Sequence, residues 1–490
     1  MKIVFAASES LPYARTGGLA DVIDALPREI ARQGHTVSVY LPLYRQVQSK
    51  GKDRKVLIPS LTIPFADYNR FAAVIDGGIH GGVQIYFIDC PELFDREYMY
   101  ETPSGYYGDN WERFALYSRA VLESTKQLGV PDVFHVHDWE AAMLPVYLGT
   151  VYQSDPALRK AATVLTVHNA GNQGIFSAET TQRLLLPAQL FTADRLEFYN
   201  QFNFLKGGIL YADAVTTVSP HYAKEVQTPE FGNRLDGVFR SRSNDLHGIL
   251  NGVDYAKWDP ATDGNIAAHY TPENLQGKVA CRRDLLHAFG LDHVPEDAPV
   301  LGVVSRFSTR TGSDLLAEAA DRLAAGDVKV GDLRVVIIGS GEPYYEGLFK
   351  GLAERYPKTI AVRNVYDETL AHKVEAGSDM FLMPSHYEPG GLGQIYGLKY
   401  GTVPVVHATG GLEDTVEQWN PETGEGTGFK FAGEDAGEFL GAIQSAVKLF
   451  RDDRAAWQKL MRNGMAKDFS WAEPARQYIA TYEEVVRRRS

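Results

Sequence analysis

The sequence has 490 residues, of which 44% are hydrophobic and 23% charged, and its net charge is -13 at pH 7. A chain of this length and composition is globular rather than disordered and is expected to form about two to four domains. The acidic charge disfavours a nucleic-acid partner, although local arginines and helix N-termini can still bind a nucleotide sugar.

Neither cysteines nor apolar segments point to an exported or membrane protein. The two cysteines, Cys90 and Cys281, imply no disulfide framework and fit two buried thiols in a reducing compartment. The first apolar run covers only residues 3–7 and is followed by Glu9, which is unlike a signal peptide. No stretch approaches the roughly 18–20 apolar residues that span a bilayer, so we expect a cytoplasmic protein.

The first half of the chain is predicted to alternate strands with helices. Residues 3–7 form a buried strand, residues 19–33 follow a helical pattern that Gly34 ends, and residues 36–40 form the next strand. This order is a βαβ unit, which calls for a parallel sheet. Further strands are predicted at residues 133–136, 163–167 and 214–218.

The same alternation restarts after Pro299. A strand at residues 300–304 precedes a helix at residues 314–325, and more strands are predicted at 335–339, 381–384 and 403–406. Two separate series indicate two doubly wound α/β domains. We expect the boundary in residues 254–299, which are polar and irregular, and a final helix over residues 472–489.

Polar residues follow several of these strands, where open α/β sheets place their sites. Arg15 precedes Gly17 and Gly18, whose backbone can approach a ligand closely before a helix N-terminus that favours anionic oxygens. A plain strand-to-helix turn is the alternative interpretation.

The segment H-V-H-D-W ends another strand. His135 and His137 share one strand face and can suggest a metal, but no third ligand set has suitable spacing. We therefore favour hydrogen bonding for the histidines and a sugar hydroxyl as the partner of Asp138. His168 ends the next strand and is a further site candidate.

The second series offers a cation and two glycine-rich turns. Arg306 follows its first strand and can donate paired hydrogen bonds to a diphosphate, although a plain surface arginine is the alternative. Residues 388–394 and 409–414 present backbone N–H groups before helices, and Glu388 can bind hydroxyls. Together they suggest a diphosphate held by helix N-termini without a dedicated metal.

Eight motifs occur in the order R-T-G-G-L-A-D-V, H-x-H-D-W, T-V-H-N, F-N-x-L-K-G-G, L-N-G-V-D, S-R-F, E-P-G-G-L and T-G-G-L-x-D-T-V. This set resembles bacterial glycogen synthases and plant starch synthases from about residue 3 to residue 482. The resemblance implies two facing Rossmann-like doubly wound domains, the GT-B glycosyltransferase architecture, with an active-site cleft between them.

The resemblance also implies the activity. Members of this family are retaining hexosyltransferases that move glucose from ADP-glucose to the non-reducing end of an α-1,4-glucan, without a metal or another cofactor. Residues 1–255 would form the acceptor and catalytic domain and residues 256–471 the nucleotide-sugar domain. Residues 472–490 would form a helix that packs back on the first domain.

Matching positions carry the family's site residues. Arg306 would hold the donor diphosphate, Glu388 would bind the donor glucose, and His168 would lie near the sugar, which makes these three the catalytic candidates. Glu9 falls on the acceptor side, and Tyr366 falls where an aromatic ring stacks on the adenine. The other donor-binding candidates are Arg15, Gly17, Gly18, Asp138, Asn251, Gly391, Leu392, Gly393, Thr409 and Gly410.

The sequence departs from the family at five positions. Arg15 and Thr311 stand where the family has lysines, Gly390 and Gly393 stand where it has Cys and Thr, and Glu140 stands where it often has His. The loss of the second lysine removes a positive charge from the place where the leaving phosphate becomes negative.

These departures leave two alternatives open. One is a related retaining transferase with a different nucleotide-sugar donor or a small acceptor. The other is a catalytically weak, glucan-binding paralogue. Arg310 is adjacent to Thr311, but neighbouring residues normally point in different directions.

Overall fold

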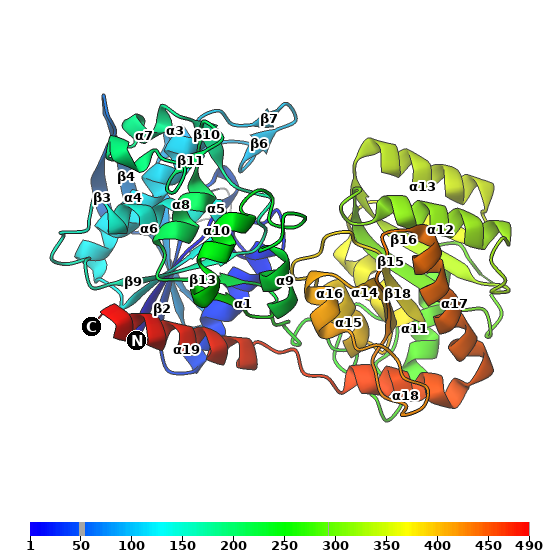
Figure 1. Cartoon of the computed structure of the whole chain (residues 1–490). Helices are drawn as coiled ribbons and strands as arrows, with labels where there is room; N and C mark the ends of the chain where they lie inside the picture. The colour runs from blue at the N-terminus through cyan, green and yellow to red at the C-terminus, as the bar shows by residue number, and fades with distance from the viewer. Residues whose placement is uncertain (49–53, 293, 490) are drawn as a thin grey trace. The chain divides into compact units, whose positions relative to one another are not determined.

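The computed structural model describes residues 1–48, 54–292 and 294–489. The chain divides into two compact units. Unit 1 comprises Met1–Gly252 and the C-terminal tail from Trp471, and unit 2 comprises Val253–Ser470. Figure 1 labels many of the helices and strands of both units.

Unit 1 contains, within the described ranges, a nine-stranded sheet in the order β14-β13-β9-β8-β1-β2-β5-β4-β3. The strands from β14 to β5 pair in parallel, as the βαβ pattern predicts. Their bounds are β1 Lys2–Ala6, β2 Thr36–Pro42, β5 Val83–Asp89, β8 Val133–His137, β9 Ala162–Val167, β13 Ala214–Thr217 and β14 Leu246–Gly248.

One edge of this sheet differs from the sequence-based expectation. β3 (Val56–Pro64) and β4 (Asn69–His80) form an antiparallel pair, and β4 also pairs antiparallel with β5. Pro59 lies inside β3, which a sheet tolerates because β3 is an edge strand with register shifts. The proline and the glycines of β4 hide the strand pattern in the sequence.

The helices of unit 1 connect the parallel strands. α1 (Leu19–Arg32) joins β1 to β2, and α4 (Asn110–Leu128) leads into β8. The last helix, α19 (Ala472–Arg489), packs against α1 and β9. The remaining helices of more than four residues are α6 Met143–Gly149, α8 Phe204–Tyr211, α9 Pro220–Glu225 and α10 Asp236–Ser241.

Short elements fill the connections of unit 1. The four-residue helices are α2 Arg45–Gln48, α3 Pro91–Phe94, α5 Asp138–Ala141 and α7 Thr180–Arg183, and the 3-10 helices are η1 Ala188–Leu190 and η2 Ser243–Asp245. The small strands are β6 Glu101–Thr102, β7 Gly105–Tyr106, β10 Ile175–Ser177, β11 Glu197–Phe198 and β12 Gln201–Asn203.

Unit 2 contains a six-stranded sheet in the order β17-β16-β15-β18-β19-β20, in which every described pairing is parallel. The strands are β15 Val300–Phe307, β16 Arg334–Gly341, β17 Ile360–Asn364, β18 Met380–Met383, β19 Val403–His407 and β20 Phe429–Phe431. The chain runs from β15 outward to β17 and then returns to the other side of β15. The order therefore reverses between β15 and β18.

Helices cover both faces of this sheet. They are α11 Gln276–Ala288, α12 Ser313–Ala325, α13 Pro343–Arg355, α14 Glu368–Gly377, α15 Gly393–Lys399, α16 Gly410–Thr415, α17 Ala436–Asp452 and α18 Arg454–Met465. The prediction that residues 254–299 are irregular is wrong for α11. This helix is rich in charged residues, and it packs against α14.

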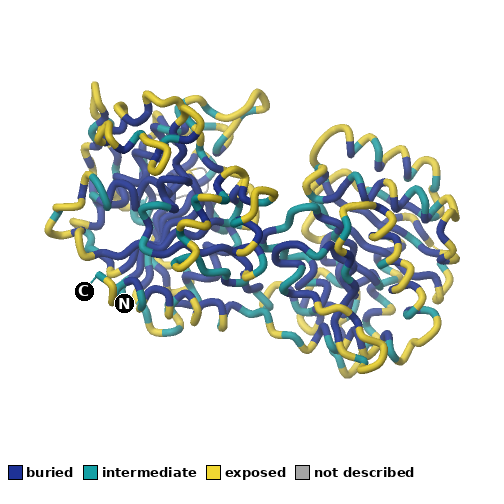
Figure 2. Tube along the Cα trace, viewed as in Figure 1, coloured by how far each residue is buried: buried dark blue, intermediate teal, exposed yellow. Residues whose placement is uncertain are grey.

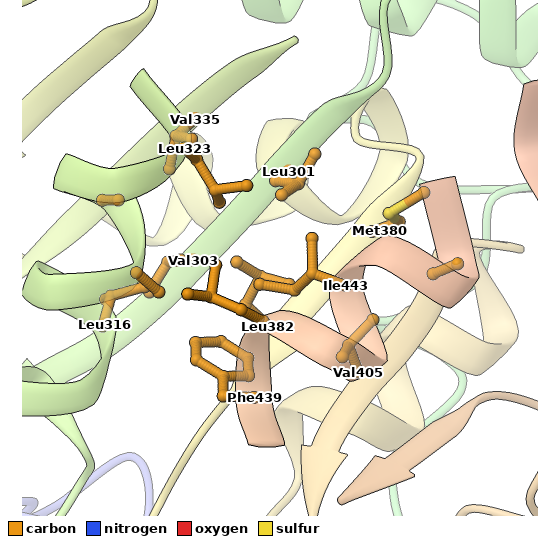
Figure 3. Packing of buried hydrophobic residues seen from close by; sticks show 14 of the residues in the cluster. Leu301, Val303, Leu316, Leu323, Val335, Met380, Leu382, Val405, Phe439 and Ile443 are labelled. Carbon is orange, nitrogen blue, oxygen red and sulfur yellow. The ribbon is translucent and has the colours of Figure 1, made fainter. Parts of the chain in front are cut away.

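The core of unit 2 explains why its strands are continuous apolar runs in the sequence. Leu301 and Val303 of β15 face one cluster with α12 and α17, while Val300 faces a second cluster with α11 and α14. Side chains alternate between the two sheet faces, so burial of both faces requires apolar residues at successive positions. Figure 3 shows the first cluster, including Leu316 from α12 and Phe439 from α17.

Burial follows this plan throughout the chain. Sheet strands are largely buried, and connecting loops carry most of the exposed residues (Figure 2). Cys90 and Cys281 are both free and buried, as the sequence indicates. None of the helices in the described part of the chain is long and apolar enough to cross a membrane.

Candidate active site

In the large sheet of each unit, the first strand has later parallel strands on both of its sides, and several of the candidate residues lie near that point. In unit 1 the chain leaves β1 toward β2 and later places β8 on the other side of β1. In unit 2 the reversal lies between β15 and β18. The crevice at the carboxyl ends of such strands is the usual ligand site of open α/β sheets.

Glu9 anchors the glycine-rich loop that follows β1. Its buried carboxylate accepts hydrogen bonds from the backbone N–H of Thr16 at 2.5 Å, the Thr16 hydroxyl at 2.5 Å and the N–H of Gly17 at 3.2 Å. The hydroxyl of Tyr100 donates to the same carboxylate at 2.7 Å. Glu9 thus fixes the loop conformation.

The loop itself is open to a ligand. Gly17 and Gly18 are exposed, and a Cβ at either position would meet nothing within 4 Å. α1 begins at Leu19 with no side-chain cap on its N-terminus. Arg15 is exposed and forms an ion pair with Asp21 at 3.2 Å. The loop therefore presents backbone and cationic groups at a helix N-terminus, which favours anions.

Asp138 connects the ends of β8 and β9. It follows β8 directly with a φ of 54°, a left-handed conformation that only a few per cent of non-glycine residues adopt. Its carboxylate accepts the backbone N–H of His168 at 2.7 Å. Burial raises the pKa of Asp138 to about 7, and the hydrogen bonds from His168 and Asn169 oppose that rise while the charge of Glu9 adds to it.

His135, His137 and His168 use ring nitrogens in hydrogen bonds within unit 1. His137 Nδ1 lies 3.0 Å from His168 Nε2. His135 uses both ring nitrogens, with Tyr482 at 2.7 Å and Thr166 at 2.6 Å, so it cannot serve as a metal ligand in this arrangement. Among the described residues there is no group of three or more acidic, His or Cys side chains that could hold a metal ion.

Two further polar residues lie buried in the same unit with one oxygen unpaired. Glu140 Oε2 and Asn251 Oδ1 have no hydrogen-bond partner in the described chain. Burial raises the pKa of Glu140 well above its usual value, and the charge of Asp138 adds to this effect. Buried polar atoms are normally paired, so both oxygens are suited to meet polar groups of a ligand.

In unit 2 the two predicted glycine-rich turns pack against each other. The N–H of Gly411 donates to the backbone oxygen of Glu388 at 3.1 Å. A Cβ on Gly410 would lie 2.1 Å from that oxygen, and one on Gly411 would lie 3.0 Å from Gly390. The close approach explains why both turns need glycine. The turn after β18 and Thr409 at the start of α16 are therefore neighbours.

Glu388 is half-buried at this junction. Ser385 donates its hydroxyl to Glu388 Oε2 at 3.3 Å. Burial raises the pKa of Glu388, against the nearby positive charge of Arg310. The helix that follows begins at Gly393, where a Cβ would lie 2.9 Å from Phe381. Packing on Phe381 accounts for glycine at this position.

The turn after β15 holds Thr311 by hydrogen bonds within the turn and places Arg310 on an aromatic ring. The Thr311 hydroxyl donates within the turn, to the backbone oxygens of Arg306 at 2.5 Å and Ser308 at 3.0 Å. The Arg310 guanidinium lies 4.1 Å from the ring centre of Tyr387, a cation–π contact. Arg306 is exposed, and its guanidinium makes no hydrogen bond or ion pair to the described chain.

The structure thus brings some of the predicted site residues together within each unit and leaves others apart. Glu9, Asp138 and His168 gather in unit 1, and Glu388 lies with the glycine turns and Arg310 in unit 2. Tyr366 follows β17, is 56% exposed and makes no recorded contact with the other candidates in the described chain.

Sequence reasoning missed Tyr100, Thr16 and Tyr387. Tyr100 lies 91 residues from Glu9, and no local motif marks it. Thr16 and Tyr387 lie beside or within recognised motifs, so their positions carried a signal.

Comparisons with known proteins agree with this architecture. Residues 2–241 match the starch synthase catalytic domain, and residues 292–463 match glycosyl transferases group 1. The glycogen synthase of Koribacter versatilis is 53% identical over 99% of this chain and 98% of that protein. The glycogen synthase of Pseudothermotoga lettingae is 39% identical over 100% of both.

A solved structure extends the likeness to three dimensions. The catalytic domain of starch synthase IV from Arabidopsis thaliana, bound to ADP and acarbose, is 32% identical with a TM-score of 0.88 and covers 99% of both chains. The fold is therefore that of the GT-B glycosyltransferases, with parallel sheets in two units, and the enzyme class is hexosyltransferase. Within that class, the chain belongs to the glycogen and starch synthase family.

Proposed function

We propose that this protein transfers glucose from ADP-glucose to the 4-hydroxyl at the non-reducing end of an α-1,4-glucan, with retention of configuration, in the cytoplasm. The observation that carries this proposal is the 53% identity to a glycogen synthase over 99% of the chain. The starch synthase IV structure, whose description names ADP and acarbose, supports both the nucleotide and the glucan side. The reaction uses no metal or other cofactor in this proposal.

The nucleotide side is assigned to unit 2. Arg306 binds the donor diphosphate, with the backbone N–H groups of Gly391–Gly393 beside it, and Tyr366 stacks on the base. The guanidinium of Arg306 is exposed and makes no hydrogen bond or ion pair to the described residues, which supports this role because its donors stay available for an anion. Glu388 binds hydroxyls of the donor glucose from the junction of the two glycine turns.

The sugar side is assigned to unit 1. His168 and Asp138 lie at the ends of adjacent parallel strands and are joined through a backbone hydrogen bond, which supports a shared role in the sugar pocket with Asn251. Arg15, Gly17 and Gly18 contribute to phosphate binding at the start of α1. Glu9 acts on the acceptor side, where its carboxylate also holds the loop in place.

The chemistry follows from where charge develops. As the bond between the glucose C1 and the phosphate breaks, positive charge grows on the sugar and negative charge on the departing ADP. Arg306 and Arg15 stabilise the leaving group, and fixed groups of this kind, aimed at developing charge, typically contribute about 3 kcal/mol each. Binding that strengthens with this charge raises turnover rather than ground-state affinity alone.

The test is a transfer assay with labelled donors. The purified protein is incubated with glycogen and either ADP-glucose or UDP-glucose, and label in the polymer is counted. Transfer from ADP-glucose supports the proposal. Transfer from UDP-glucose alone assigns a different donor, an outcome that the non-cationic Thr311 would help to explain. Glucan binding without transfer from any donor identifies a weakly catalytic paralogue and overturns the proposal.

A further inference from the structure

The contact between His137 and His168 has no role in the assignments above. His137 is the last residue of β8, and His168 directly follows β9, the neighbouring parallel strand. His137 Nδ1 and His168 Nε2 are 3.0 Å apart. His137 is fully buried, with its ring stacked on Phe5 at 5.5 Å and an interplanar angle of 13°.

Both rings are neutral at physiological pH. Burial lowers the pKa of His168 to about 3 and holds the pKa of His137 well below its usual value. Each imidazole therefore carries one proton, on one of its two nitrogens. The contact between them contains one N–H and one lone pair, so the position of the proton on one ring fixes its position on the other.

The buried nitrogen of His137 decides between the two arrangements. His137 Nε2 has no hydrogen-bond partner within the described residues. If His168 Nε2–H were the donor, the His137 proton would sit on Nε2 as a buried, unpaired N–H. If His137 Nδ1–H is the donor, Nε2 keeps only an unpaired lone pair. Unpaired buried N–H groups are rarer in proteins than under-satisfied acceptors, so the second arrangement is favoured.

We propose that His137 is a positioning residue that donates its Nδ1–H to His168 Nε2 and thereby holds the His168 proton on Nδ1. His168 then offers a hydrogen-bond donor, rather than an acceptor, to an oxygen of the bound sugar. The Nδ1 atom of His168 makes no hydrogen bond to the part of the chain that the structure describes, so its proton stays available. The proposal deepens the sugar-binding role assigned to His168 and rests on it.

His135 provides a matched control. It lies on the same face of β8 with its ring centre 4.1 Å from that of His137, and it is equally buried. Its hydrogen bonds go to Tyr482 and Thr166 and not to His168. A change at His135 therefore disturbs the same strand and removes the same volume without touching the bond to His168.

The first measurement needs no substrate. Nitrogen-15 NMR of the full-length, histidine-labelled protein identifies which nitrogen of each imidazole is protonated, and a His168→Gln sample assigns the His168 signal. We expect His168 to be protonated on Nδ1 in the wild type and in His135→Leu. A wild-type His168 protonated on Nε2 overturns the proposal, whether or not any variant folds.

The second measurement compares variants in the transfer assay. His137→Leu removes the donor, so the His168 tautomers should mix and kcat should fall on the order of tenfold or more, since a wrong tautomer is costly in enzymes that depend on one. His137→Asn keeps an N–H near the Nδ1 position and should retain kcat to within about threefold of the wild type. The KM for glucan should change little in either variant.

Two results with His137→Leu would contradict a positioning role for His137. If His137→Leu leaves the His168 tautomer unchanged, or lowers kcat no more than His135→Leu does at matched thermal stability, His137 has only a structural role. A failure of the proposed function can be told apart from a failure of this proposal. If the wild-type protein transfers glucose from no donor, NMR still reports which nitrogen of His168 is protonated.

Discussion

Hydrogen bonds hold the candidate carboxylates of unit 1 in place, whereas Arg306, the candidate diphosphate-binding cation of unit 2, is exposed. In unit 1, Glu9 accepts four hydrogen bonds, from Thr16, Gly17 and Tyr100, and Asp138 holds the backbone of His168. In unit 2, the Arg306 guanidinium makes no hydrogen bond or ion pair to the described chain.

This difference matches the chemistry assigned to each unit. A sugar is neutral and is recognised by the directions of its hydroxyls, which requires side chains fixed in advance. The attraction between a diphosphate and a guanidinium group acts over a longer distance than a hydrogen bond to a hydroxyl. An exposed arginine can therefore bind a diphosphate without being held in one conformation beforehand. Substitutions in unit 1 should therefore disturb the fold and the reaction together, and substitutions at the exposed cation should disturb the reaction alone.

The largest effect is expected at Glu388. It belongs to unit 2, but its carboxylate is partly buried and accepts a hydrogen bond from Ser385, like the candidate carboxylates of unit 1. Glu388→Ala should abolish transfer, because it removes the carboxylate assigned to the donor glucose from the junction of the two turns. Steady-state kinetics should show less than a tenth of wild-type turnover, a barrier increase above roughly 1.4 kcal/mol. Glu354→Ala, an exposed glutamate on α13, serves as the control and should keep full turnover. Retention of more than a tenth by Glu388→Ala would contradict the assignment.

Arg306→Ala tests the exposed cation. It should weaken ADP binding in isothermal titration and lower turnover by about tenfold to a hundredfold, as for loss of a charge-assisted phosphate contact. Thermal stability should change little, because the guanidinium is exposed and makes no hydrogen bond or ion pair to the described chain. Arg283→Ala removes an exposed arginine from α11 as a control. Unchanged affinity and turnover in Arg306→Ala would show that Arg306 does not bind the diphosphate.

Asp138→Asn tests the buried network through pH. The pKa of Asp138 is about 7 in the folded protein and about 3.9 in an unfolded chain. The folded state therefore binds the proton more tightly, and this contribution to stability is complete below pH 4 and is lost as pH rises through 7.

The asparagine variant lacks this titration. Its thermal midpoint should gain on the wild type as pH rises from 5 to 8, by the equivalent of about 1–3 kcal/mol. Parallel melting curves measured at several pH values check this. If the difference between variant and wild type is the same at every pH, Asp138 does not titrate in that range.

The smallest expected effect concerns Thr311. Thr311→Lys adds a cation near the proposed diphosphate site and should raise turnover with ADP-glucose by about tenfold, or roughly 1.4 kcal/mol. The change also removes the hydroxyl bonds to Arg306 and Ser308, which should cost about 1 kcal/mol of stability. Kinetics and thermal melting measure the two effects separately.

Arg310 determines how this result is interpreted. Its guanidinium packs on Tyr387, and its charge partly opposes the rise that burial causes in the pKa of Glu388, so Arg310 already supplies a cation near Glu388. If Arg310 replaces the family's lysine, Arg310→Ala alone should cripple transfer and the added Thr311→Lys should restore it. If neither change alters the rate with any donor, position 311 does not reach the diphosphate.

The sequence predicted those parts of the site that depend on local pattern. The strand ends at His137 and His168 and both glycine turns follow the predicted pattern, because alternating strands and helices bring strand ends to one edge of a sheet. β15 runs further than predicted and includes Arg306. What it could not predict depends on contacts between distant segments. The Tyr100 bond to Glu9 and the antiparallel edge formed by β3 and β4 leave no periodic signature. Proline and glycine within those two strands further weaken the pattern.

Unit 1 contains a helix, α19, that follows unit 2 in the chain. Tyr482 of this last helix is fully buried in unit 1, where it bonds to His135 of β8, 347 residues earlier. During synthesis, chains emerge at roughly 5–20 residues per second and domains tend to fold in the order in which they appear. All residues of unit 2 precede α19 in the chain and are therefore made before that helix. Unit 1, although its first residues are made before unit 2, gains this buried contact only after α19 has been synthesised, so a chain truncated before Trp471 would leave unit 1 incomplete.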